Sequence, residues 1–101
     1  MPLIRVATTG DVPAGEGRVV DAAGKSIALF NVEGTFYATD NLCPHRGGPL
    51  GDGDLEGTVV LCPWHAWRWD VTTGANSLNP AVKIACFATR VEGSEVFVEL
   101  P

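Results

Sequence analysis

The chain has 101 residues, 46% of them hydrophobic, which fits a single domain over residues 1–101 with one modest core. Twelve acidic residues outnumber seven basic ones and give a formal net charge of −5. This balance argues against a nucleic-acid partner, which needs a positive patch. No apolar run is long enough to span a bilayer, and the first residues do not resemble a secretory signal. We therefore expect a cytoplasmic protein that does not bind membranes.

The first forty residues alternate between short apolar segments and turns. We expect strands at 3–8, 18–21, 25–31 and 35–39, with turns at 22–24 and at Glu33-Gly34. No segment has a convincing helical period, and the turns recur about every eight to twelve residues. This pattern predicts an all-β sandwich or barrel.

Two short segments carry the residues with the most distinctive chemistry. Cys43-Pro44-His45 and Cys62-Pro63-Trp64-His65 each offer one thiol and one imidazole, and sixteen residues separate His45 from Cys62. A 2Fe–2S cluster of Rieske type needs this set, because two cysteines hold one iron and two histidines hold the other. Two alternatives stay open. One is a zinc site, although the two ligands of each pair in a zinc site are usually of the same type, two Cys or two His. The other is a metal-free site in which these are four ordinary side chains.

The segments around these pairs suggest how the chain presents them. We expect strands at 58–61 and 66–71, so that each pair lies in a loop at the tip of a hairpin. The turn-forming residues 46–50 can aim backbone N–H groups at cluster sulfides. Residues 51–57 carry Asp52, Asp54 and Glu56, and we interpret them as a solvated acidic loop.

Three other side chains allow competing interpretations. Trp67 and Trp69 share one face of the expected strand, which favours shielding or core filling over an electron relay. Cys86 lies in the apolar stretch 82–88, where a lone cysteine is expected to be a small buried side chain without a redox role. Residues 88–92 and 95–100 predict a closing hairpin around Gly93-Ser94.

The two ligand pairs, their prolines and the glycines after Arg46 closely resemble the Rieske family, most strongly over residues 40–74. The whole strand pattern is similar to the stand-alone Rieske ferredoxins of ring-hydroxylating dioxygenase systems. The resemblance implies stacked antiparallel sheets with a small cluster-binding subdomain, about residues 41–81, made of two ligand loops. It also implies a third loop over the cluster, for which 77–80 is the candidate. The implied ligands are Cys43 and Cys62 on the inner iron, and His45 and His65 on the outer iron.

This chain departs from the respiratory branch of the same family. That branch has a disulfide between its ligand loops, at positions that match Gly48 and Trp64 here. It also has serine and tyrosine hydroxyls near the cluster, at positions that match Trp67 and Trp69. Because neither indole can donate an O–H bond, the resemblance implies a potential near the low end of the Rieske range, about −150 mV.

The number of histidines limits the functions that the chain can have. His45 and His65 are the only histidines, so none remains for the mononuclear iron of a terminal oxygenase, and no glycine-rich nucleotide motif is present. We expect an electron-transfer protein, not an enzyme, that carries one electron from a flavin-dependent ferredoxin reductase to a terminal oxygenase such as an aromatic ring-hydroxylating dioxygenase. The alternative is the small Rieske-like subunit of an NAD(P)H-dependent nitrite reductase.

The expected mode of docking follows from charge. We expect a monomer that docks on basic patches of both partners. An apolar rim of Pro49, Leu50 and Pro80 would surround the point of electron exit.

Overall fold

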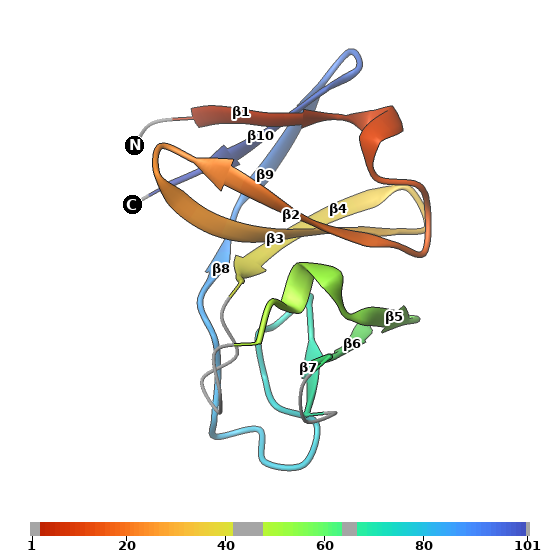
Figure 1. Cartoon of the computed structure of the whole chain (residues 1–101), viewed down its shortest axis with the longest axis vertical. Helices are drawn as coiled ribbons and strands as arrows, with labels where there is room; N and C mark the ends of the chain where they lie inside the picture. The colour runs from red at the N-terminus through yellow and green to blue at the C-terminus, as the bar shows by residue number, and fades with distance from the viewer. Residues whose placement is uncertain (1–2, 42–47, 64–66, 101) are drawn as a thin grey trace.

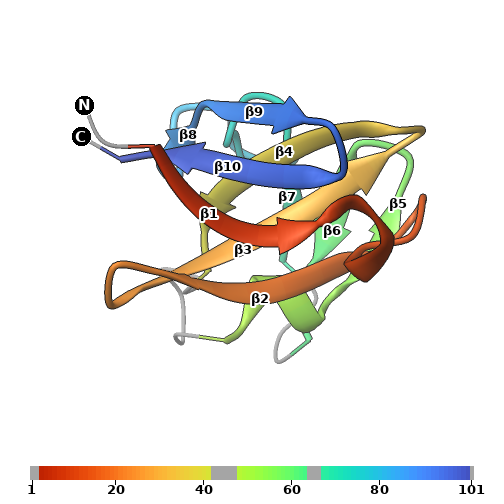
Figure 2. The ribbon, with the colours of Figure 1, turned by 90° about the horizontal axis from the view of Figure 1, so that it is seen from above.

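The computed structural model describes residues 3–41, 48–63 and 67–100, and nearly all of its regular structure is β. Figures 1 and 2 show three antiparallel sheets. The first sheet has the order β1 (Leu3–Thr8), β10 (Glu95–Glu99), β9 (Thr89–Glu92). The second has the order β2 (Gly17–Ala22), β3 (Lys25–Val32), β4 (Thr35–Asp40), β8 (Cys86–Phe87). The third has the order β5 (Asp54–Glu56), β6 (Val59–Leu61), β7 (Arg68–Asp70).

Two short 3-10 turns complete the described structure: η1 (Thr9–Asp11) follows β1, and η2 (Leu50–Asp52) precedes β5. Within the described ranges no helix is long and apolar enough to cross a membrane.

Strand β3 separates two buried clusters. Ile27 and Leu29 face the upper cluster, whereas Ala28 and Phe30 face the lower one, because successive side chains of a strand point to opposite sides. Burial on both sides explains why residues 25–31 are almost continuously apolar. The upper cluster contains Ala7, Val12, Val20, Ala22, Ile27, Leu29, Phe36, Ala38, Val96, Val98 and Leu100. The lower cluster contains Ala28, Phe30, Leu50, Val60, Cys62, Trp69, Val71 and Ile84.

Two tight turns fix the register of the second sheet. Ala23 and Gly24 link β2 to β3, and Glu33 and Gly34 link β3 to β4, each with positive φ at both central residues. This is the backbone that two-residue hairpins favour. In the second turn the Gly34 N–H donates to Oδ1 of Asn31 over 2.7 Å.

The expected strands at 3–8, 18–21, 25–31, 35–39, 58–61, 66–71, 88–92 and 95–100 are confirmed, with ends shifted by at most two residues. The expectation of a plain loop over 51–57 is wrong, because β5 pairs with β6 there. Leu55 packs on the lower cluster, whereas Asp54 and Glu56 are exposed, so the acidic side chains are solvated as expected. The short strand β8 was not predicted as a separate strand.

Candidate metal centre

Asn41 joins the two ends of the segment that contains the first ligand pair. Its backbone carbonyl accepts from the Leu50 N–H over 2.7 Å, and its Oδ1 accepts from the Gly51 N–H over 2.9 Å. Its Nδ2 donates to Oγ of Ser26 over 3.0 Å, and the side chain is buried. Cys43 and His45 lie outside the described residues. The first segment is therefore closed by one buried asparagine, which sequence reasoning missed.

Cys62, of the second ligand pair, directly follows β6 in the connection to β7. Leu61 pairs with Arg68, and the next pair is closed by the Cys62 N–H, which donates to the Trp67 carbonyl over 2.7 Å. The Cys62 residue is only 2% exposed and is not in a disulfide. His65 lies outside the described residues. The expectation that the first pair also lies at a hairpin tip is wrong. The strand before it, β4, pairs with β3 and β8, and the element after it is η2, not a strand paired with β4.

Two glycines let η2 approach the strands beside it. A Cβ on Gly51 would lie 2.7 Å from the Val19 backbone nitrogen. A Cβ on Gly53 would lie 2.1 Å from the Leu61 carbonyl oxygen, closer than atoms can pack. These close approaches hold the exit of the first segment against β2 and against β6, the strand that leads to Cys62.

The inner face of the β6–β7 hairpin is formed by Val60, Cys62, Trp67 and Trp69. Trp69 is fully buried in the lower cluster, and Trp67 packs against it with ring centroids 6.1 Å apart and a tilt of 42°. Core filling is confirmed for Trp69, whereas Trp67 is only partly buried. Nε1 of Trp69 is the one buried side-chain nitrogen or oxygen in the described ranges that has no hydrogen-bond partner.

The candidate third loop lies beside the second ligand loop. The Ser77 N–H donates to the Arg68 carbonyl over 2.9 Å, and Oδ1 of buried Asn76 accepts from the N–H groups of Leu78 and Asn79. Residues of this loop, together with Trp67 and Arg68, line a groove of about 560 Å³. Its position fits the expected third loop, and coverage of a cluster by 77–80 stays a prediction.

Two expectations about single side chains are wrong. Cys86 is exposed because β8 is the edge strand of its sheet, although the register places Cys86 on the same face as Thr39 and Ala28. Partial burial of the thiol, with smaller contributions from the carboxylates of Asp70 and Asp40, raises the pKa of Cys86. Leu50 is fully buried in the lower cluster and cannot belong to an exposed rim, although Pro80 is exposed.

The residues present fit a Rieske 2Fe–2S group. Two thiols and two imidazoles are the donors that such a group requires. The one ligand candidate that is described, Cys62, is a buried free thiol at a hairpin tip, beside a buried indole N–H that lacks an acceptor. No cluster of three or more His, Cys, Asp or Glu occurs in the described ranges, from which Cys43, His45 and His65 are missing.

Comparison with known proteins agrees with this fit. The Rieske [2Fe-2S] domain family matches residues 3–88. The ferredoxin component of the naphthalene 1,2-dioxygenase/salicylate 5-hydroxylase systems of a Ralstonia species is 41% identical over 98 residues, covering 96% of this chain and 94% of that protein.

Solved structures have the same fold. A chain in the complex of reduced oxygenase and oxidized ferredoxin in carbazole 1,9a-dioxygenase superposes with a TM-score of 0.85 and 33% identity, over 95% of this chain and 91% of that chain. A protein described as the small subunit of an NADPH nitrite reductase superposes with a TM-score of 0.83 over 99% and 100% of the two chains. Its identity of 18% shows the shared fold alone. The chain therefore belongs to the Rieske [2Fe-2S] family, whose members carry a Rieske-type 2Fe–2S cluster.

Proposed function

We propose that Cys43, His45, Cys62 and His65 hold the cluster, with the two thiolates on one iron and the two imidazoles on the other. The burial of Cys62 at the tip of a closed hairpin supports this assignment. Leu50, at the exit of the first segment, packs in the same buried cluster as Cys62. Once bound, the group supplies one-electron redox chemistry.

We further propose that the chain is a low-potential ferredoxin that carries single electrons from a flavin-dependent reductase to a terminal oxygenase, such as an aromatic ring-hydroxylating dioxygenase. The observation that carries this proposal is that Cys62 and Leu50, which flank the two ligand segments, pack in one buried cluster. The names of the relatives support it, because these are ferredoxin components of dioxygenase systems. Both histidines of the sequence belong to the ligand pairs, so the chain acts as a carrier and not as a catalyst.

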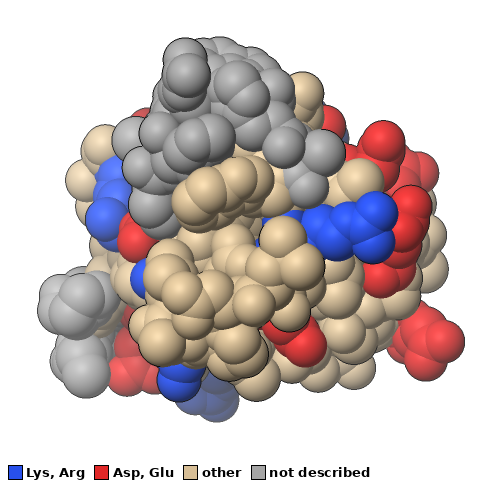
Figure 3. Space-filling view, turned by 90° about the horizontal axis from the view of Figure 1, so that it is seen from below, with Lys and Arg blue, Asp and Glu red and all other residues tan. Residues whose placement is uncertain are grey.

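The surface beside the ligand loops suits transient docking. Leu78 is 94% exposed and Val82 is 37% exposed, on the groove that Trp67 also lines. Figure 3 shows that uncharged side chains cover much of the described part of this end, with a few basic side chains among them and a group of acidic side chains along one edge. We propose that this end approaches both partners while the net charge of −5 steers the chain to basic patches.

The remaining proposals concern organisation and location. We propose one domain over residues 1–101, with its cluster-binding part at about 41–81, a monomeric state and a cytoplasmic location. The third sheet supports this division, because β5, β6 and β7 all lie between residues 54 and 70.

The first test is chemical analysis of the purified protein. We expect two irons and two acid-labile sulfides per chain and, after dithionite reduction, a Rieske EPR signal with a low average g value. Replacing His65→Cys should alter or abolish the signal, whereas the control Cys86→Ser should leave it unchanged. One zinc per chain without labile sulfide would contradict the assignment.

The second test is electron transfer in a reconstituted chain of reductase, this protein and a ring-hydroxylating oxygenase. Turnover should require the protein and should fall as salt rises, because the docking charges are screened. Charge reversal of an exposed acid in β5, such as Asp54→Lys, should slow turnover. Insensitivity to both changes would contradict the docking proposal. Support of NAD(P)H-dependent nitrite reduction, with stable binding to a large subunit, would favour the nitrite reductase alternative.

A further inference from the structure

The unpaired N–H of Trp69 is unusual for its surroundings. The residue is fully buried, and its Nε1 has no acceptor, which is the case for no other buried side-chain nitrogen or oxygen in the described part of the chain. A buried indole usually finds a hydrogen-bond partner, because an unpaired donor loses its bond to water on folding. An acceptor that is missing from the protein atoms is therefore expected to come from another group.

The strand register shows that Trp69 shares a face with Cys62. Val60 lies directly opposite Trp69, and Cys62 is the next residue on the same face of β6, opposite Trp67. Cys62 and Trp69 are thus diagonal neighbours, a separation that aromatic side chains can span. Both residues pack in the lower cluster with Leu50, which follows the first ligand segment.

A buried water is a poor alternative acceptor. A water inside a protein needs two to four polar partners. Among the buried hydrophobic residues around Trp69 only Cys62 carries a polar side-chain atom, and the buried polar residue that forms a bridge with Trp69, Asn76, already accepts two backbone N–H groups through its Oδ1. The Cys62 thiol is the only sulfur among the buried members of the lower cluster, and it belongs to the proposed ligand set.

We propose that Nε1–H of Trp69 donates a hydrogen bond to a sulfur atom of the bound 2Fe–2S cluster and thereby raises its reduction potential. The proposal rests on the proposed ligand set. Reduction adds one negative charge to the acceptor, and hydrogen bonds to charged acceptors are stronger than those to neutral ones. Hydrogen bonds to cluster sulfurs are among the factors that set the potential. Trp69 would thus supply one N–H donor at one of the two positions where the respiratory branch has hydroxyls, while the potential stays in the low range expected from the lack of both O–H groups.

The decisive experiment removes the donor and keeps the ring shape. Trp69 is replaced at that site alone by β-(3-benzothienyl)alanine, in which sulfur stands in place of the N–H, and the midpoint potential is measured by protein-film voltammetry. We expect the equilibrium constant for reduction to fall about tenfold, a downward shift of about 59 mV for one electron. Trp69→Phe should shift the midpoint in the same direction. The control Val60→Ala loosens the same packing without removing a donor and should leave the midpoint unchanged.

A measurement on the unchanged protein covers the case in which the variants do not fold. Resonance Raman spectra in heavy water should show shifted Fe–S stretching bands. Bridging and terminal bands then distinguish a sulfide acceptor from a thiolate acceptor. HYSCORE spectra of reduced protein with ¹⁵N-labelled indole should show coupling to one indole nitrogen, and this coupling should be absent in Trp69→Phe where that variant folds.

The outcomes separate the two proposals. A protein without iron and labile sulfide would contradict the ligand set itself. A protein with full iron and sulfide, but with no indole coupling or with an unchanged midpoint after removal of the N–H, would contradict only the role of Trp69.

Discussion

The two buried clusters on either side of β3 differ in chemistry. The upper cluster, between the first two sheets, consists of aliphatic side chains and Phe36, and none of its members carries a polar side-chain atom. The lower cluster includes the thiol of Cys62 and the unpaired N–H of Trp69. The upper part is therefore complete as a protein core, whereas the lower part contains two groups that we propose find their partners in the bound 2Fe–2S cluster.

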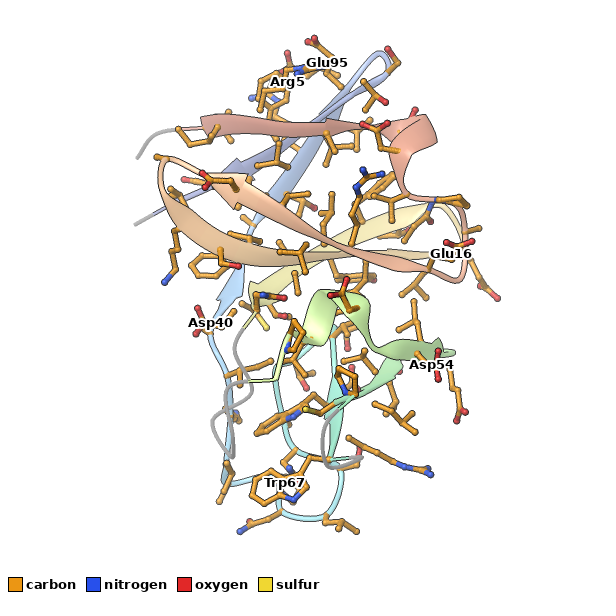
Figure 4. The ribbon with its side chains drawn as sticks, in the orientation of Figure 1. Arg5, Glu16, Asp40, Asp54, Trp67 and Glu95 are labelled. Carbon is orange, nitrogen blue, oxygen red and sulfur yellow. The ribbon has the colours of Figure 1, made fainter. Side chains whose placement is uncertain are left out.

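Figure 4 shows that the two parts also differ in position. The Arg5–Glu95 ion pair lies at the upper end, and Trp67 lies at the opposite end. Because β3 contributes to both clusters, the upper part can serve as a rigid support on which the lower part is assembled. This division predicts that changes near the ligand loops affect the bound 2Fe–2S cluster and leave the upper sheets folded.

The largest effect is expected for Cys62→Ala. Loss of this thiolate should abolish the visible absorption and reduce labile sulfide to background, because the iron would lose one of its protein ligands. Far-UV circular dichroism should keep its β signature, since the upper cluster is untouched. Cys86→Ala is the control, and its iron and labile-sulfide contents should equal those of the unchanged protein. Retention of a stoichiometric cluster in Cys62→Ala would contradict the ligand assignment.

The next effect is expected for Gly53→Ala. The backbone at Gly53 has φ −76, which alanine adopts readily, so only space opposes the change. The added Cβ would meet the Leu61 carbonyl, a backbone atom that cannot move without displacing β6. We expect the free energy of unfolding to fall by about 3 kcal/mol and the 2Fe–2S cluster to be lost faster.

Gly10→Ala is the matched control for that change. A Cβ at Gly10 meets no atom within 4 Å, and its backbone is not in the left-handed region. Urea unfolding should show this variant to be as stable as the unchanged protein or slightly more stable. Equal destabilisation by both substitutions would mean that the close packing of η2 on β6 does not govern stability.

The sequence predicted the upper part better than the lower part, for identifiable reasons. Strands such as β3 and β4 are apolar segments joined by a two-residue turn, and local pattern suffices to locate them. Strand β5 was missed because its two acidic residues flank a single inward side chain, Leu55. With only three residues, the alternation is too short to be distinguished from a charged loop.

The site was predicted from its donor types, but not how it is supported. The spacing of the Cys and His pairs is visible in sequence, whereas the bonds from Asn41 to Leu50 and Gly51 depend on the folded path of the chain. Gly51 and Gly53 are separated by one residue, which hinted at close backbone approach without showing what they approach. Exposure of Cys86 depends on β8 being an edge strand, which apolar neighbours in sequence cannot reveal.

A pair of buried asparagines allows the two parts to be compared directly. Asn31 supports the upper part, where its Nδ2 donates to the Val12 carbonyl over 2.8 Å and its Oδ1 accepts from Gly34. In the lower part, Nδ2 of Asn41 donates to Oγ of Ser26, and its Oδ1 accepts from the Gly51 N–H. Asn31→Ala and Asn41→Ala should each cost about 2 kcal/mol, because buried backbone groups lose their partners.

Only Asn41→Ala should release iron faster when a chelator is added, since only Asn41 closes a ligand segment. Ser26→Ala, which removes the outer bond of Asn41 alone, should have a smaller effect on both stability and release. Equal rates of iron release from Asn31→Ala and Asn41→Ala would show that general destabilisation, and not loop closure, controls cluster retention.

The smallest effect is expected at Asp11 in the upper part, far from the ligand loops. Its Oδ2 accepts from the Thr8 N–H over 2.9 Å, and hydrogen bonds from the Thr8 backbone and side chain, with smaller help from Arg18 and Arg5, hold the pKa of Asp11 below its ordinary value of 3.8. A carboxyl whose pKa is lowered by folding stabilises the folded state above its unfolded pKa, and this contribution is lost as pH falls through the folded pKa.

Asp11→Asn keeps an acceptor for Thr8 and removes the charge, so it isolates this effect. The urea midpoint of the variant should lie slightly below that of the unchanged protein at neutral pH, and the gap should close between about pH 5 and pH 2. The cluster spectrum at neutral pH should be identical in the two proteins, because the change lies beside the upper cluster alone. A gap that stays constant down to the acid end would mean that the charge of Asp11 is not the source of the difference in stability. A shifted spectrum would mean that the two sides of β3 are coupled more tightly than their separate packing implies.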